Sequence, residues 1–138
     1  MTAFVIDNSV AIAWFLPNQA TAYTDRLLER AMTRTLHAPS VWPLEFANAL
    51  WGLQRRKLLS AEQVDEIVEK GEALAVEVDR HSPPMSLVLM LSRRHRLSTY
   101  DASYLELALR LRLPLAAKDG PLVEAAKKAG VLLTATPR

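Results

Sequence analysis

The chain has 138 residues, no cysteine and four glycines, with 17 Lys and Arg residues against 15 Asp and Glu residues for a net charge of +2. A chain of this length buries roughly two thirds of its surface on folding, so one domain over residues 1–138 needs neither disulfides nor a structural metal. The lack of cysteine excludes disulfide scaffolds, cysteine-ligated zinc, iron–sulfur clusters and thiol catalysis.

Neither a signal peptide nor a membrane span is expected. Asp7 interrupts the first apolar run and the first basic residue is Arg26, whereas a signal peptide needs a basic start and an unbroken apolar segment. Residues 62–79 hold seven of the acids but only one base, Lys70. The rest of the chain could therefore attract a polyanion, although solvated helix faces would give the same pattern. We expect a cytoplasmic protein that contacts no membrane.

Short apolar runs alternate along the chain with longer stretches of helical periodicity. In chain order, the sequence predicts a strand over residues 3–7, helices over 9–15 and 21–34, a strand over 36–38, helices over 40–57 and 61–74, a strand over 76–79, helices over 82–94 and 99–112, a strand over 114–118, a helix over 121–129 and a strand over 131–134. Helical crossovers between strands imply parallel pairing. We therefore expect an α/β fold with three layers, α/β/α, around a central, mostly parallel sheet of about five strands.

Several familiar catalytic patterns are missing from the sequence. It has no glycine-rich phosphate loop of the dinucleotide or P-loop type, and no G-x-S-x-G elbow. The three histidines, His37, His81 and His95, lack metal-binding spacing. The acidic residues are therefore the first candidates for chemistry.

Two acids follow predicted strands. Asp7 ends the run Phe4 to Ile6, and Asp119 follows the strand that ends at Lys118. Ligands of parallel sheets bind beyond the carboxyl ends of the strands, so both carboxylates are expected at one rim. Each could instead be a turn residue or a helix N-cap.

Two further acids lie in predicted helices. Glu45 shares a stripe of polar and small residues with Asn48, and we expect Asn48 to support its carboxylate by a hydrogen bond. An exposed face with Glu45 paired to a base is the alternative. Asp101 opens an apolar-rich helix, where it could simply favour the positive helix start. Glu106, on another face of that helix, is interpreted as a surface acid.

Carboxylates gathered at one rim repel each other, by about 4 kcal/mol per pair at 4 Å and an effective dielectric constant of 20. A bound divalent cation is a common compensation. Oxygen ligands select Mg²⁺ or Mn²⁺ over Zn²⁺ or Cu²⁺. We therefore expect Mg²⁺, with Mn²⁺ as a possible substitute, to orient water and stabilise charge on a phosphodiester.

These acids lie in four short segments, residues 5–9 (VIDNS), 43–50 (PLEFANAL), 99–104 (TYDASY) and 115–119 (LAAKD). In this order and spacing the segments resemble the motifs of PIN-domain ribonucleases, specifically the VapC-type toxins of toxin–antitoxin pairs. The resemblance covers nearly the whole chain.

The resemblance implies an acidic quartet of Asp7, Glu45, Asp101 and Asp119, with Asp7 and Asp101 as direct Mg²⁺ ligands. Ser9, Asn48 and Thr99 match the family's supporting polar positions. One position departs from the pattern: Ala117 stands two residues before Asp119, where the family usually carries a small hydroxyl residue.

The implied activity is endonucleolytic hydrolysis of RNA by a metal-activated water, with basic runs such as Arg55 to Lys57 binding phosphates. The implied partners are a cognate antitoxin, which blocks the site, and a second copy of the chain in a homodimer. Two alternatives stay open: a non-catalytic PIN-fold module that binds RNA or protein, and a phosphoacceptor signalling domain with Asp7 as the acceptor.

Overall fold

The computed structural model describes residues 2–118 and 120–135. The strands are β1 (Ala3–Ile6), β2 (Thr35–Ala38), β3 (Glu77–Val78) and β4 (Leu115–Ala116). The α-helices are α1 (Asn8–Ala13), α2 (Ala22–Ala31), α3 (Trp42–Arg55), α4 (Ala61–Ala73), α5 (Met85–His95), α6 (Thr99–Leu111) and α7 (Pro121–Lys128), and one short 3₁₀ helix covers Pro17–Gln19.

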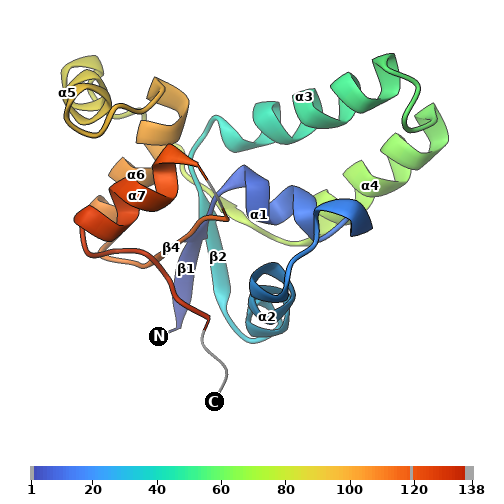
Figure 1. Ribbon diagram of the computed structural model, residues 1–138, viewed down its shortest axis with the longest axis horizontal. Coiled ribbons are helices and arrows are strands. Elements are labelled where there is room, and N and C mark those ends of the chain that lie inside the picture. The colour runs from blue at the N-terminus through green and yellow to red at the C-terminus, as the bar shows by residue number, and fades with distance from the viewer. Residues whose placement is uncertain (1, 119, 136–138) are drawn as a thin grey trace.

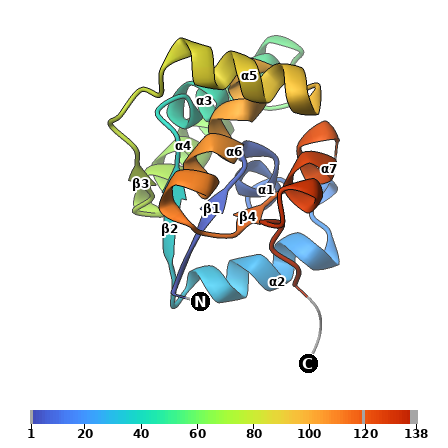
Figure 2. The same cartoon turned by 90° about the vertical axis from the view of Figure 1, so that its left-hand side faces the viewer.

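The four strands form one parallel sheet in the order β3-β2-β1-β4. Helices lie on both sides of this sheet: Figure 1 shows α6 and α7 on one side of β1, and α1 and α2 on the other. The turned view in Figure 2 shows α6 lying in front of the strands. This arrangement confirms the predicted three-layer α/β/α fold.

Two details of the prediction were wrong. The described residues contain four strands instead of about five, because residues 131–134 make only one isolated bridge, between Leu132 and Leu115. The helix predicted from residue 82 begins at Met85, with Pro84 as its N-cap. A proline keeps the preceding residue out of the helical region, so two consecutive prolines delay the helix start.

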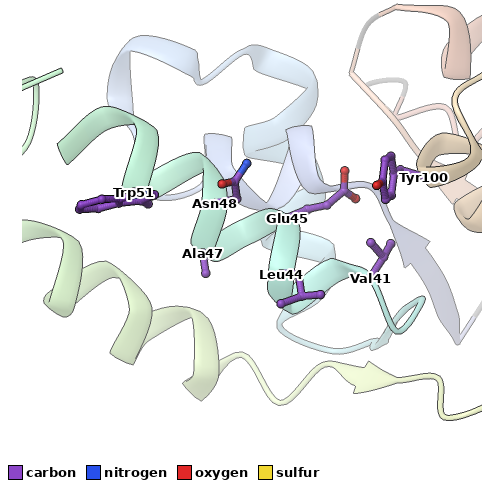
Figure 3. Close-up of a pocket in the computed structure, with 7 residues that line it drawn as sticks. All are labelled: Val41, Leu44, Glu45, Ala47, Asn48, Trp51 and Tyr100. Atoms are coloured by element: carbon purple, nitrogen blue, oxygen red, sulfur yellow. The ribbon is translucent and has the colours of Figure 1, made fainter. Parts of the chain in front are cut away.

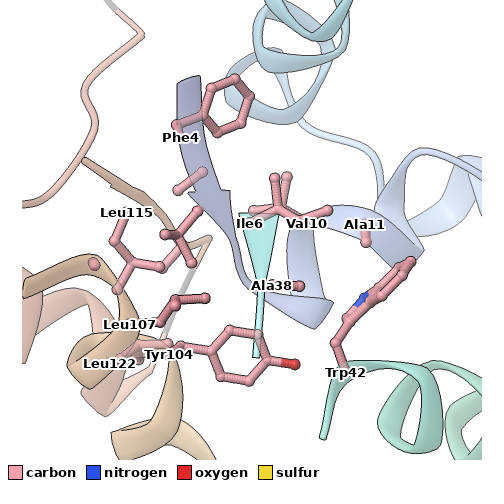
Figure 4. Packing of buried hydrophobic residues seen from close by; sticks show 14 of the residues in the cluster. Phe4, Ile6, Val10, Ala11, Ala38, Trp42, Tyr104, Leu107, Leu115 and Leu122 are labelled. Carbon is pink, nitrogen blue, oxygen red and sulfur yellow. The ribbon is translucent and has the colours of Figure 1, made fainter. Parts of the chain in front are cut away.

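The hydrophobic core is centred on β1, whose four residues are all buried. A strand covered on both faces needs an unbroken apolar run, and Ala3–Ile6 supplies one. Figure 4 shows Phe4 and Ile6 of β1 near Leu115 of β4 and Tyr104 of α6, which are all fully buried. This core fixes the end of β1 and the start of α6, where Asp7 and Asp101 lie.

Glu106 corrects another expectation, because it is buried instead of lying at the surface. The guanidinium of Arg110 donates to both Glu106 oxygens at 2.9 Å, and to Asp79 Oδ2 at 2.6 Å. The hydrogen bond from Arg110 holds the pKa of Asp79 below its usual value. Arg110 therefore ties α6 to the segment that follows β3.

Replacing Arg110 with Met should lower the free energy of unfolding by about 3 kcal/mol, because the buried Glu106 carboxylate loses its partner. Urea denaturation measures this loss. The matched control is Lys127→Met, which breaks the exposed Lys127–Glu124 pair and should cost less than about 1 kcal/mol. Equal losses in the two variants would contradict a structural role for the Arg110 pairs.

No α-helix within the described part of the chain is long and apolar enough to cross a lipid bilayer.

Candidate active site

Asp7 lies where the order of the sheet reverses. After β1 the chain builds β2 and β3 on one side of it, and later returns to place β4 on the other. Such a switch point leaves a crevice beyond the carboxyl ends of the two diverging strands. The Asp7 backbone NH donates to the Ala116 carbonyl at 2.9 Å. This hydrogen bond fixes Asp7 at the rim between β1 and β4.

Asp7 is also the N-cap of α1. The two alternatives for Asp7, a helix N-cap and a carboxylate at the rim of the sheet, are therefore both correct. Its Oδ2 accepts hydrogen bonds from the Ser9 hydroxyl at 2.5 Å and from the Ser9 NH at 3.3 Å. Burial raises the pKa of Asp7 to about 6, against the lowering effect of the Ser9 hydroxyl and with a further increase from the charge of Asp101. The predicted supporting role of Ser9 has a physical basis, because it holds the Asp7 carboxylate in one orientation.

A pocket of about 490 Å³, here called the acid pocket, lies in front of Asp7. Its lining residues are Asp7, Asn8, Ser9, Ile12, Gln19, Glu45, Ala49, Leu53, Arg56, Asp101, Gly120, Pro121 and Leu122. Three of the four predicted acids therefore share one pocket, although they come from the junction of β1 and α1, from α3 and from α6. The fourth, Asp119, lies outside the described residues, so its predicted role stays a prediction.

Glu45 is half-buried in the first turn of α3 and accepts a 2.6 Å hydrogen bond on Oε1 from the Tyr104 hydroxyl. The expected support from Asn48 is replaced by this bond from the buried Tyr104 of α6, since the exposed Asn48 lines a neighbouring groove. Burial raises the pKa of Glu45, Tyr104 lowers it in part, and the charge of Asp101 raises it further. Burial also raises the pKa of Tyr104, so its hydroxyl stays a donor.

Changing Tyr104 to Phe should raise the pKa of Glu45 and cost about 1.5 kcal/mol of stability, because the carboxylate loses a charge-assisted hydrogen bond. An NMR titration of the Glu45 carboxyl carbon measures the shift. Tyr23→Phe is the control, since the Tyr23 hydroxyl donates to the Leu133 carbonyl and not to an acid. It should destabilise the fold and leave the Glu45 titration unchanged; a shift of equal size in both variants would rule out a direct effect.

Asp101 lies in the first turn of α6, whose N-cap is Ser98. The Asp101 NH donates to the Ser98 hydroxyl at 3.0 Å, so Ser98 performs the capping and the Asp101 carboxylate is left to face the pocket. Partial burial raises the pKa of Asp101. The predicted supporting residue Thr99 is exposed and does not line the acid pocket.

Three features in or next to the acid pocket were not predicted from the sequence. Arg56 lines the acid pocket beside the carboxylates, Tyr104 bonds Glu45, and Asn8 carries a buried Oδ1 atom without a hydrogen-bond partner. Arg56 was recognised only as part of a basic run. Asn8 directly follows the strand-end Asp7, and that position alone could have marked it as a pocket residue.

The donor set of the acid pocket fits a hard divalent cation. It offers carboxylate groups from Asp7, Glu45 and Asp101, which all line the pocket. Within residues 2–118 and 120–135, no three acids or histidines come close enough to hold an ion together. Mg²⁺ needs no such cage, because it is commonly bound by one or two carboxylates and several waters. The pocket therefore fits a hydrated Mg²⁺ ion better than a closed protein site.

Comparisons with known proteins agree with this geometry. The PIN domain family model matches residues 4–128. Ribonuclease VapC3 of Pyrobaculum aerophilum is 27% identical over 122 residues, which are 87% of this chain and 92% of that protein. Ribonuclease VapC3 of Mycobacterium tuberculosis strain H37Rv is 35% identical over 108 residues, or 78% and 74% of the two chains. The crystal structure of PAE2754 from Pyrobaculum aerophilum has the same fold, with a TM-score of 0.70 and 22% identity over 90% of this chain and 79% of that one. The chain therefore belongs to the PIN-domain family and, within it, to the VapC-type proteins.

Proposed function

We propose that this protein is a Mg²⁺- or Mn²⁺-dependent endoribonuclease that acts as the toxin of a toxin–antitoxin pair. The observation that carries the proposal is the convergence of Asp7, Glu45 and Asp101 on one pocket at the switch point of the sheet. The charge of Asp101 raises the pKa of both other acids, so Asp101 repels each of them. The relatives named Ribonuclease VapC3 support the same activity.

The polar residues Asp7, Ser9, Glu45, Arg56 and Asp101 of the pocket each have a defined task in this proposal. Asp7 and Asp101 bind the cation, and Ser9 holds Asp7 in orientation. Glu45, held by Tyr104, orients a water by accepting its hydrogen bond. Arg56 neutralises a phosphate of the RNA beside the acids. When bound, the cation supplies Lewis-acid chemistry: it lowers the pKa of a water and stabilises charge that develops on the phosphodiester.

The proposal includes two protein partners. A cognate antitoxin would block the acid pocket, and a basic side chain of that partner would complement the three acids electrostatically. A second copy of the chain would form a homodimer. The cytoplasm supplies the RNA, and a chain without cysteine suits its reducing conditions.

The test of the activity is incubation of the purified protein with a mixed cellular RNA pool in Mg²⁺ or Mn²⁺, beside an EDTA control. Discrete fragments that appear with metal and vanish with EDTA are the expected result. Uncut RNA with either metal, together with retained RNA binding, would overturn the nuclease and favour the non-catalytic module. Ala117 stands where the family usually carries a hydroxyl residue, and this difference favours the non-catalytic module.

The proposed metal site has a separate test that does not use activity. Mg²⁺ should raise the melting temperature of the wild-type protein, because it relieves repulsion among Asp7, Glu45 and Asp101. Asp101→Asn should respond much less. Glu66→Gln is the matched control, because it removes an exposed charge paired with Lys70 on α4. Equal Mg²⁺ shifts in all three proteins would argue against a site in the acid pocket.

A further inference from the structure

A pocket of about 520 Å³, here called the basic pocket, lies next to the segment that follows β4. It is formed by the start of α2, the end of β4, the first turn of α7 and the last described segment, residues 132–135. Figure 2 shows this last segment passing from the level of α7 down beside α2. Among the described residues, none lines both the basic pocket and the acid pocket, so the two are separate sites.

Hydrogen bonds hold the walls of the basic pocket in place. The Tyr23 hydroxyl of α2 donates to the Leu133 carbonyl at 2.7 Å. The Leu133 NH in turn donates to the Leu115 carbonyl of β4 at 2.8 Å. Arg26, about one helical turn after Tyr23, donates to the Ala135 carbonyl. The last described segment is therefore fixed to both α2 and β4, and the pocket between them needs little rearrangement to receive a ligand.

The lining of the basic pocket is positively charged. Its charged residues, within the part of the chain that the structure describes, are Arg26 and Lys118. Neither of them forms an ion pair with a described acid. Arg26 uses one donor for the Ala135 carbonyl, and its other donors stay available. Because two cations that share a pocket repel each other, the basic pocket favours an anion.

The neighbouring cavities have the opposite character. The groove along α3 has seven lining residues, all drawn in Figure 3, which include one acid, Glu45, and no base. The acid pocket has three carboxylates beside Arg56. Without a metal these two cavities repel an anion, whereas the basic pocket attracts it.

The composition of the lining indicates which anion fits. Arginine and lysine are typical ligands of phosphate groups, and the hydroxyls of Thr21 and Thr134 add further donors. Val123 and Leu132 form an apolar part of the wall. A phosphate ion alone has no use for this part, but a sugar or a base packs against it. The volume of about 520 Å³ also suits a ligand larger than an inorganic ion.

We propose that the basic pocket binds the phosphate of a nucleotide unit, with Arg26 and Lys118 as its ligands. The Asp7 NH bonds the Ala116 carbonyl, and the next two residues, Ala117 and Lys118, line the basic pocket. The site therefore lies close to the acids. The unit is either a neighbouring nucleotide of an RNA strand held in the acid pocket or a free nucleotide. The first source rests on the proposed ribonuclease function, and the second does not.

The first experiment measures phosphate binding without RNA or metal. Inorganic phosphate, adenosine monophosphate and adenosine are titrated into isotope-labelled protein in EDTA at constant ionic strength, and NMR follows the backbone amides. The monophosphate should bind more tightly than phosphate or adenosine, and should shift the amide signals that line the basic pocket. Lys118→Gln should weaken its binding about tenfold, because one charge-assisted hydrogen bond is lost. Lys118→Arg keeps the charge and should bind within about twofold of the wild type.

The matched control is Lys128→Gln, which removes the same charge from the exposed end of α7 and should bind the monophosphate like the wild type. Equal losses in Lys118→Gln and Lys128→Gln would overturn the proposal, since the binding would then be a general attraction to a basic protein. Amide shifts of the wild type that lie outside the basic pocket would overturn it too, and this result does not depend on how any variant folds.

RNA cleavage in Mg²⁺ then distinguishes the two sources of the nucleotide. If the pocket holds a unit of the substrate, Lys118→Gln should raise the KM for RNA about tenfold and change kcat much less, while Lys128→Gln changes neither. If the pocket holds a free nucleotide, Lys118→Gln should weaken binding of the monophosphate and leave the KM for RNA unchanged.

Failure of the basic pocket and failure of the nuclease give different results. Wild-type protein that binds the monophosphate in the basic pocket but cuts no RNA would remove the ribonuclease and keep the pocket. Metal-dependent cleavage by a wild-type protein that binds neither phosphate nor the monophosphate would remove the pocket and keep the ribonuclease.

Discussion

Asp101→Asn should reduce metal-dependent RNA cleavage at least about 100-fold while leaving the fold intact. The substitution removes a proposed cation ligand from the acid pocket and keeps the size of the side chain. The cap of α6 should survive, since the Ser98 hydroxyl accepts from the backbone NH of residue 101 and not from its side chain. The measurement is the initial rate of fragment formation in Mg²⁺ at a fixed protein concentration.

The control for this prediction is again Glu66→Gln, which removes one negative charge at the surface of α4 and should cut RNA at the wild-type rate. Circular dichroism should show the same helix content in all three proteins. Cleavage by Asp101→Asn at more than about half the wild-type rate would mean that the chemistry does not depend on this carboxylate.

Asp7→Asn should stabilise the metal-free protein by up to about 3 kcal/mol near neutral pH, and it should abolish cleavage as well. The Asp7 pKa is raised from 3.8 to about 6, chiefly by burial, and one pKa unit corresponds to about 1.4 kcal/mol. The neutral amide avoids that cost. Asn is also as good an N-cap as Asp, so α1 keeps its start.

The same shift sets the sign of a pH dependence in EDTA. Between pH 3.8 and about 6 the folded protein holds a proton on Asp7 that the unfolded chain has released, so the Asp7 contribution to stability falls as pH rises through this window. Urea denaturation across the window should show the wild type losing stability relative to Asp7→Asn, with the largest gap above pH 6. A gap that stays constant with pH would contradict a raised pKa, and saturating Mg²⁺ should narrow the gap.

The order of helices and strands was predictable because its signals are local. Ala3–Ile6 is an unbroken apolar run, Ser60 and Gln63 form the predicted capping box, and α3 begins with Pro43 in its first turn. The number of strands was harder to predict from the sequence. β3 and β4 have two residues each, and whether residues 131–134 join the sheet depends on tertiary contacts that periodicity does not report.

The sequence predicted the carboxylates of the acid pocket better than the residues that form hydrogen bonds with them. Asp7 follows a strand and Asp101 lies in the first turn of a helix, and both positions can be predicted from the sequence. The Glu45–Tyr104 hydrogen bond joins residues 59 apart, so it depends on how α3 meets α6. Glu106 was wrongly predicted to lie at the surface for the same reason. Its surroundings depend on the hydrogen bonds of Arg110 to Glu106 and to Asp79, which come from different parts of the chain.

The family match also separates the functional alternatives that the sequence left open. It favours a PIN-fold nuclease or binding module over a phosphoacceptor signalling domain. A cleavage assay separates the nuclease from the binding module, because both carry the same fold and the same acid pocket.

The position of β1 at the centre of the sheet has a consequence for the timing of synthesis. β1 is synthesised before β4 and α7, yet Asp7 is fixed by the carbonyl of Ala116, and residues 120–122 line the acid pocket. Contacts so distant along the chain form late in folding. A nascent chain therefore carries an incomplete acid pocket until residues 116–122 have been synthesised.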